Sequence, residues 1–229
     1  MKTKQLGFFS FLLAFLTLAW VVLLIWGMAS AGPLETFEQV LAYAARGGAL
    51  FTLTYANATL LTLIASMLFA GLYRYCREAS PLWATVGLVF VPVYCLLNLL
   101  AYFSQITVVP RLVELSHVAG QQEMAEFALR QVIQQWPDSA ASIFNNLAYA
   151  ILGIPSILYG AILYRMRRSL RLGAILLALN GVACIAGVIG VSLRSSPLSL
   201  GSVVGGVLFL AALVALGWVF NREEKLALS

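Results

Sequence analysis

The 229-residue sequence is 62% hydrophobic and only 10% charged, whereas soluble globular proteins carry roughly 25% charged residues. Its net charge of +5 comes from 14 lysine and arginine residues that are scattered between apolar runs, so they form no basic face for a nucleic acid. The composition therefore excludes an ordinary soluble domain and a nucleic-acid partner, and it predicts a protein of the lipid bilayer.

Six apolar stretches are each long enough to cross a bilayer as a helix, which takes about 20 residues. Glycine and proline residues interrupt the chain between most of these stretches. The sequence therefore predicts an all-α, polytopic transmembrane helix bundle that forms one integral membrane domain over residues 1–229. The spans run approximately over residues 8–28, 49–73, 82–109, 141–164, 172–193 and 198–220.

The first stretch also imitates a secretory signal, because a basic start precedes it and Ala29-Ser30-Ala31 is a small-residue cleavage pattern. Its length of about 21 residues exceeds the usual apolar region of a signal, which has about 7–15 residues. We therefore predict an uncleaved first helix. The alternative is cleavage after Ala31, which would leave five spans.

Two connections between spans carry helical patterns of their own. Phe37, Val40, Leu41 and Ala44 recur at helical spacing between residues 33 and 46, ahead of Gly47-Gly48. Between residues 121 and 136 an apolar stripe that starts at Met124 shares the segment with charged residues. We predict two short amphipathic helices on the outer face, which either fill the membrane interface or form a lid over a cavity.

The basic residues predict the orientation of the spans. If the amino terminus is cytoplasmic, ten lysine and arginine residues lie in inner segments and four lie in outer segments, which accounts for all 14. Short cytoplasmic loops carry an excess of positive charge. The sequence therefore predicts that both termini are inside the cell. The inner residues are Lys2, Lys4, Arg74, Arg77, Arg165, Arg167, Arg168, Arg171, Arg222 and Lys225, and the outer ones are Arg46, Arg111, Arg130 and Arg194.

Polar residues within spans concentrate in the predicted outer half, and some of them share one face of a helix. Such residues normally face other helices or a wet cavity. The leading functional hypothesis is an outward-opening pocket between spans 2, 3 and 4 that binds a small amphiphile or lipid. The pocket candidates are Asn57, Asn98, Tyr102, Gln105, Asn146 and Tyr149. The alternative is that these side chains only bond helix to helix.

Two further patterns predict contacts with lipid and with protein. Arg165, Arg167, Arg168 and Arg171 form the densest charge run, which either anchors the chain at the inner surface or contacts anionic head groups. Gly201 and Gly205 are spaced by four residues in the last span, a pattern that allows backbones to approach closely. We predict that they serve helix packing, within the chain or in a homo-oligomer or a complex with a membrane protein partner.

Signs of catalysis are sparse. No charged residue lies securely at the centre of a span, which argues against proton-coupled transporters and ion pumps. We predict no catalytic residue, no metal site and no cofactor, since catalytic and metal-binding motifs are absent. The alternatives to ligand binding are a structural or partner-binding subunit and an enzyme that uses the outer loop around His117, with Glu114 or Asp138 orienting the imidazole.

Residues 154–190 also carry a resemblance. Ile154-Pro155-x-x-x-Tyr159-Gly160, Leu163-Tyr164-Arg165, Leu172-Gly173 and Asn180-Gly181-Val182 follow in that order. This order resembles a family of uncharacterised bacterial six-helix integral membrane proteins that is defined only as a domain of unknown function. The resemblance implies a multi-pass protein of the bacterial cytoplasmic membrane, and it implies no activity or site residues.

Overall fold

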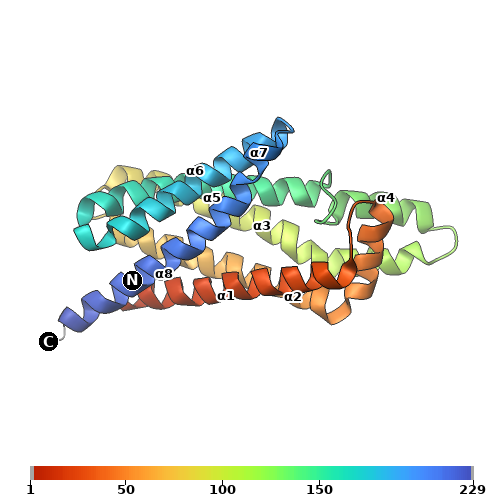
Figure 1. Cartoon of the computed structure of the whole chain (residues 1–229), viewed down its shortest axis with the longest axis horizontal. Helices are drawn as coiled ribbons and strands as arrows, with labels where there is room; N and C mark the ends of the chain where they lie inside the picture. The colour runs from red at the N-terminus through yellow and green to blue at the C-terminus, as the bar shows by residue number, and fades with distance from the viewer. Residues whose placement is uncertain (1–2, 228–229) are drawn as a thin grey trace. The chain divides into compact units, whose positions relative to one another are not determined.

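The computed structural model describes residues 3–227, and it describes side chains up to residue 222. This part of the chain is helical, and no strand occurs in it (Figure 1). The helices are α1 (Thr3–Ala31), α2 (Phe37–Cys76), α3 (Pro81–Ser116), α4 (Gln122–Val132), α5 (Ala140–Met166), α6 (Arg171–Ser192), α7 (Ser196–Ser199) and α8 (Gly201–Ala227), with a short 3-10 turn at Arg168–Leu170. The all-α prediction is confirmed.

Within the described residues, six helical segments are long and apolar enough to cross a membrane. They are Thr3–Ala31, Phe37–Cys76, Pro81–Ser116, Ala140–Met166, Arg168–Ser192 and Ser196–Arg222. Each predicted span matches one of them, and only the fifth, residues 172–193, ends one residue beyond its segment, so the prediction of a six-span integral membrane protein is confirmed. The orientation, the membrane and the uncleaved first helix stay predictions.

The chain divides into two compact units, which we describe separately. Unit 1 consists of residues 1–15, 63–95 and 146–229, and unit 2 consists of residues 16–62 and 96–145. Each of the helices α1, α2, α3 and α5 contributes residues to both units. Neither unit is a continuous segment of the chain. The single domain over residues 1–229 stays a prediction.

In unit 1, glycine residues allow helices α5, α6 and α8 to approach closely. A Cβ atom on Gly153 of α5 would lie 2.7 Å from the carbonyl oxygen of Gly181 in α6. On α8, a Cβ atom on Gly205 would lie 2.5 Å from Sγ of Cys184, and one on Gly201 would lie 2.7 Å from the backbone nitrogen of Gly187. Gly201 and Gly205 therefore face α6 of the same chain.

Unit 2 contains both predicted amphipathic helices. The first begins at Phe37, after a capping box in which Thr36 Oγ1 accepts a hydrogen bond from the backbone N–H of Gln39 (3.3 Å) and Gln39 Oε1 accepts one from the N–H of Thr36 (3.0 Å). It ends at Gly48, whose backbone (φ 42°, ψ −124°) is not helical and suits a residue without a Cβ atom. The second amphipathic helix is α4.

Both amphipathic helices pack into the core of unit 2. Phe37, Val40 and Tyr43 from the first helix join Leu129 of α4 and Ile133 just after it. The Arg130 guanidinium lies 4.0 Å from the centre of the Phe37 ring and 5.8 Å from the ring of Trp136, a cation–π arrangement.

One detail of the predicted stripe on α4 is wrong. Ala125 and Leu129 are the buried residues of this helix, whereas Met124 is 66% exposed and Phe127 is 68% exposed. The small Ala125 side chain allows α4 to lie close to the core. Met124 therefore points away from it.

Candidate functional site

Polar side chains from α3, from the connection after α4 and from the start of α5 form a continuous chain of hydrogen bonds in unit 2. Gln105 Nε2 donates to the carbonyl oxygen of Val132 (2.9 Å), and Gln105 Oε1 accepts from the backbone N–H of Gln134 (3.1 Å). Gln134 Nε2 donates to Asn145 Oδ1 (2.9 Å), and Asn145 Nδ2 donates to Asn98 Oδ1 (3.0 Å). We call these four side chains the outer polar network.

Gln105 explains why the connection after α4 holds its shape. It is fully buried, and its side chain bonds to the last carbonyl of α4 and to the second peptide N–H beyond it. The final carbonyls of a helix have no partner within the helix. Gln105, which lies 27 positions before Val132 in the chain, therefore caps the carboxyl end of α4.

A second polar group lies beside this network. Gln135 Nε2 donates a hydrogen bond to the Tyr55 hydroxyl, and Gln135 also lies within hydrogen-bonding reach of the Tyr43 hydroxyl. The ring of Tyr55 packs near that of Tyr102, with 6.1 Å between their centroids. The two tyrosine hydroxyls and the Gln135 amide thus form a second, uncharged polar group.

Three buried polar atoms of unit 2 lack a hydrogen-bond partner. They are Nδ2 of Asn98, Oε1 of Gln134 and Oε1 of Gln135. Buried polar atoms in native proteins are nearly always bonded, so each exception needs an explanation. Together these atoms provide one unused donor group and two unused acceptors.

The cavities show where space is available. In unit 2, a cavity of about 170 Å³ is lined by Ser30, Ala31, Tyr43, Arg46, Gly47, Leu50 and Phe51. Its wall includes Tyr43, the residue that also lies beside Gln135. In unit 1, a groove of about 510 Å³ is lined by Ala79, Ser80, Trp83, Leu158, Ala161, Ile162, Arg165 and Met166. None of the six predicted pocket residues lines either space.

The structure places those six residues in different settings. Asn98 and Gln105 belong to the outer polar network, and Tyr102 packs beside Tyr55. Asn57 donates a hydrogen bond to the carbonyl oxygen of Leu16 (2.9 Å). The remaining two, Asn146 and Tyr149, belong to unit 1, where the Tyr149 ring lies 6.4 Å from that of Tyr94. Their role as pocket lining stays a prediction.

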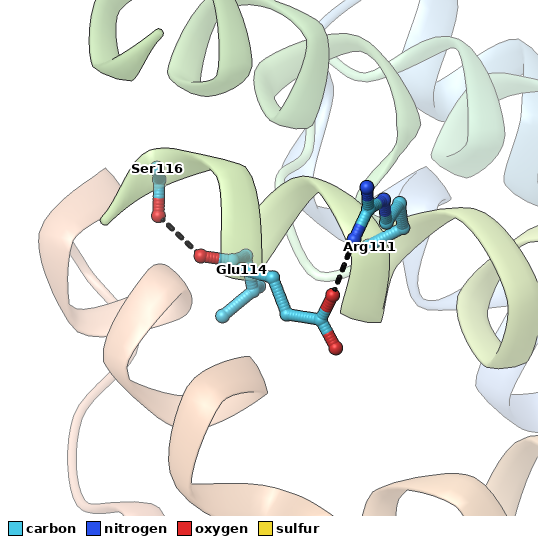
Figure 2. Close-up of polar contacts among 4 residues, drawn as sticks. Arg111, Glu114 and Ser116 are labelled. Carbon is cyan, nitrogen blue, oxygen red and sulfur yellow. Dashed lines mark hydrogen bonds and ion pairs between the residues drawn. The ribbon is translucent and has the colours of Figure 1, made fainter. Parts of the chain in front are cut away.

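The loop around His117 does not bring a base and a carboxylate together. The Glu114 carboxylate lies 2.9 Å from the Arg111 guanidinium, and both side chains are exposed; Figure 2 shows this pair on α3. His117 is exposed on the turn that follows, and its backbone N–H donates to the carbonyl oxygen of Glu114 (3.2 Å). Among the described residues, no ion pair joins His117 to Asp138 or Glu114. The geometry thus gives little support to catalysis here.

The four arginines of the basic run differ in their surroundings. Arg165 lines the groove in unit 1, and the Arg171 guanidinium lies 5.0 Å from the centre of the Tyr164 ring. Arg167 and Arg168 are exposed. Head-group contact by all four stays a prediction, and Arg165 is the one beside a groove.

No protein-family model matches the sequence, and no curated protein or solved structure is significantly similar to it. The resemblance to bacterial six-helix membrane proteins therefore stays a prediction.

Proposed function

We propose that this integral membrane protein binds a small amphiphile with an uncharged polar head in unit 2, on the predicted outer side of the membrane. The observation that carries the proposal is the set of three buried atoms without partners, on Asn98, Gln134 and Gln135. Leaving a buried donor or acceptor unbonded costs about 1–3 kcal/mol. A ligand that bonds to these atoms would remove that cost.

The chemistry of these atoms favours a hydroxyl or amide head group. Such a group donates a hydrogen bond to a glutamine Oε1 and accepts one from the asparagine Nδ2. The side chains of the outer polar network are all uncharged, so burying a charged head beside them would leave its charge without a partner. Arg46 lines the 170 Å³ cavity, but it is exposed and its Nε donates to the carbonyl oxygen of Ala42. We therefore expect the site beside the outer polar network to prefer neutral amphiphiles to anionic ones.

The position of Gln134 and Gln135 suggests how a ligand reaches the site. Both lie in the connection between α4 and α5 and are half-buried. The 170 Å³ cavity has room for several water-sized groups, and Tyr43, which lines it, also interacts with Gln135. The proposed site uses residues of unit 2 only, so it does not require Asn146 or Tyr149.

Thermal unfolding of the purified protein tests this proposal. A short-chain monoacylglycerol at about 100 times its dissociation constant would contribute about 2.7 kcal/mol, which raises the Tm of a chain of this size by about 5–10 °C. Asn98→Leu and Gln135→Leu should lose this shift. Asn180→Leu is the matched control, because Asn180 is a buried amide of unit 1, and it should keep the shift from a lower starting Tm.

Two results would contradict the proposal. One is a full monoacylglycerol shift in both Asn98→Leu and Gln135→Leu. The other is equal stabilisation by the fatty acid of the same chain length, since a carboxylate head should bind less well.

A structural role for the outer polar network is the second candidate function, and the hydrogen bonds that already join its four side chains favour it. In that case Asn98→Leu and Gln135→Leu lower the Tm by the same amount whether or not an amphiphile is present. The same titration therefore distinguishes the two functions.

A further inference from the structure

The groove of about 510 Å³ in unit 1 combines an apolar wall with one positive charge. Leu158, Ala161 and Ile162 line it on α5, and Arg165 follows on the same helix. Residues three, four and seven positions apart lie on one face of a helix. Over the seven positions from Leu158 to Arg165, about 10 Å at 1.5 Å per residue, the wall changes from apolar to cationic.

The opposite wall is held in place. Ala79, Ser80 and Trp83 line the groove at the beginning of α3. The Tyr159 hydroxyl of α5 donates a hydrogen bond to the carbonyl oxygen of Ala84 (3.3 Å). A Cβ atom on Gly87 would lie 2.7 Å from the Tyr159 ring, so this glycine makes room for it. The groove is therefore a packed feature of α3 and α5.

The charge at the end of the groove is available to a ligand. Arg165 is exposed, and among the described residues it has no carboxylate partner. None of the residues that line the groove is acidic. Trp83 is 54% exposed, and tryptophan is enriched where head groups meet the acyl region of a membrane.

We propose that this groove binds one anionic phospholipid, with its phosphate at Arg165 and the first part of an acyl chain against Leu158, Ala161 and Ile162. The apolar wall distinguishes a lipid from free phosphate, because an inorganic ion would leave that wall uncovered. A guanidinium that has no carboxylate partner among the described residues favours an anionic phospholipid over a zwitterionic one, because the choline of a zwitterionic lipid offsets the phosphate charge to which the guanidinium bonds. The inference is independent of the proposed function, which uses residues of unit 2.

Native mass spectrometry in a neutral detergent tests this site with dioctanoyl phosphatidylglycerol as the probe. Arg165→Gln should weaken binding about fivefold, the effect of about one basic side chain near a membrane surface. Arg168→Gln is the matched control, since Arg168 is an exposed arginine of the same run that does not line the groove. It should change the affinity less than twofold.

A second variant tests the apolar wall. Ala161→Phe places a ring in the groove, and because Ala161 is exposed the variant should fold, which gel filtration verifies. It should abolish binding of the phosphatidylglycerol while Arg165 is intact. Asn98→Leu should leave this binding unchanged, which separates failure of this site from failure of the unit 2 site.

Three outcomes would overturn the lipid site. Equal losses in Arg165→Gln and Arg168→Gln would indicate diffuse attraction to the basic run. Equal binding of dioctanoyl phosphatidylcholine would show that the negative charge is not recognised. Displacement of the lipid by millimolar inorganic phosphate would show that the acyl wall adds nothing.

Discussion

Replacing Gln105 with methionine should destabilise unit 2 by removing the cap on α4. Methionine has a similar volume, so the loss of hydrogen bonds dominates over packing. The carbonyl oxygen of Val132 and the N–H of Gln134 lose their bonds to this side chain, and each unbonded buried group costs about 1–3 kcal/mol. Gln134 is only half-buried, so water offsets part of the loss. We expect a total cost of about 2–3 kcal/mol.

Thermal unfolding in detergent measures this cost. A chain of this size changes its Tm by about 2–4 °C for each kcal/mol, so Gln105→Met should lower the Tm by about 4–12 °C. Gln131→Met is the control, because Gln131 is exposed on α4 and such substitutions usually change stability by less than about 0.5 kcal/mol. Hydrogen exchange should also become faster in residues 133–136. If Gln105→Met unfolds at the same temperature as Gln131→Met, the capping role is wrong.

Three more predictions concern packing and topology. Gly205→Leu should lower stability by about 1–3 kcal/mol through overpacking, because a Cβ atom at Gly205 would lie 2.5 Å from the sulfur of Cys184. Gly206→Leu should be tolerated, because no atom lies within 4 Å of a Cβ atom there. Equal Tm values for the two variants would contradict the α6–α8 packing. Arg130→Ala should lower the Tm by about 2–4 °C, the equivalent of about 1 kcal/mol for its aromatic contacts, and an unchanged Tm would mean that these contacts add no stability. In intact cells an impermeant thiol reagent should label Ala119→Cys and not Ser169→Cys, and the reverse pattern would invert the predicted orientation.

The sequence predicted the features that depend on local properties. Span length and hydropathy are read within a window of about 20 residues, and all six spans are present. Helical periodicity likewise revealed both amphipathic helices, and Gly48 does interrupt α2. The position of each helix along the chain follows from its own residues.

The partners of the polar side chains could not be predicted in this way. The amphipathic helix predicted between residues 121 and 136 included Gln134 and Gln135, but α4 ends at Val132. That end leaves Gln134 and Gln135 in a connection whose partners are 11 to 80 residues away in the chain. Periodicity also failed to distinguish Met124 from Ala125, because adjacent residues differ by only about 100° around a helix.

Native mass spectrometry of the protein extracted from its membrane in a mild detergent tests the proposed function most directly. We predict that the native protein carries one bound neutral amphiphile, and that a variant combining Asn98→Leu with Gln135→Leu loses it while the Asn180→Leu control retains it. A native protein without bound amphiphile, or the same amphiphile at the same occupancy in the double variant, would contradict a ligand site in unit 2.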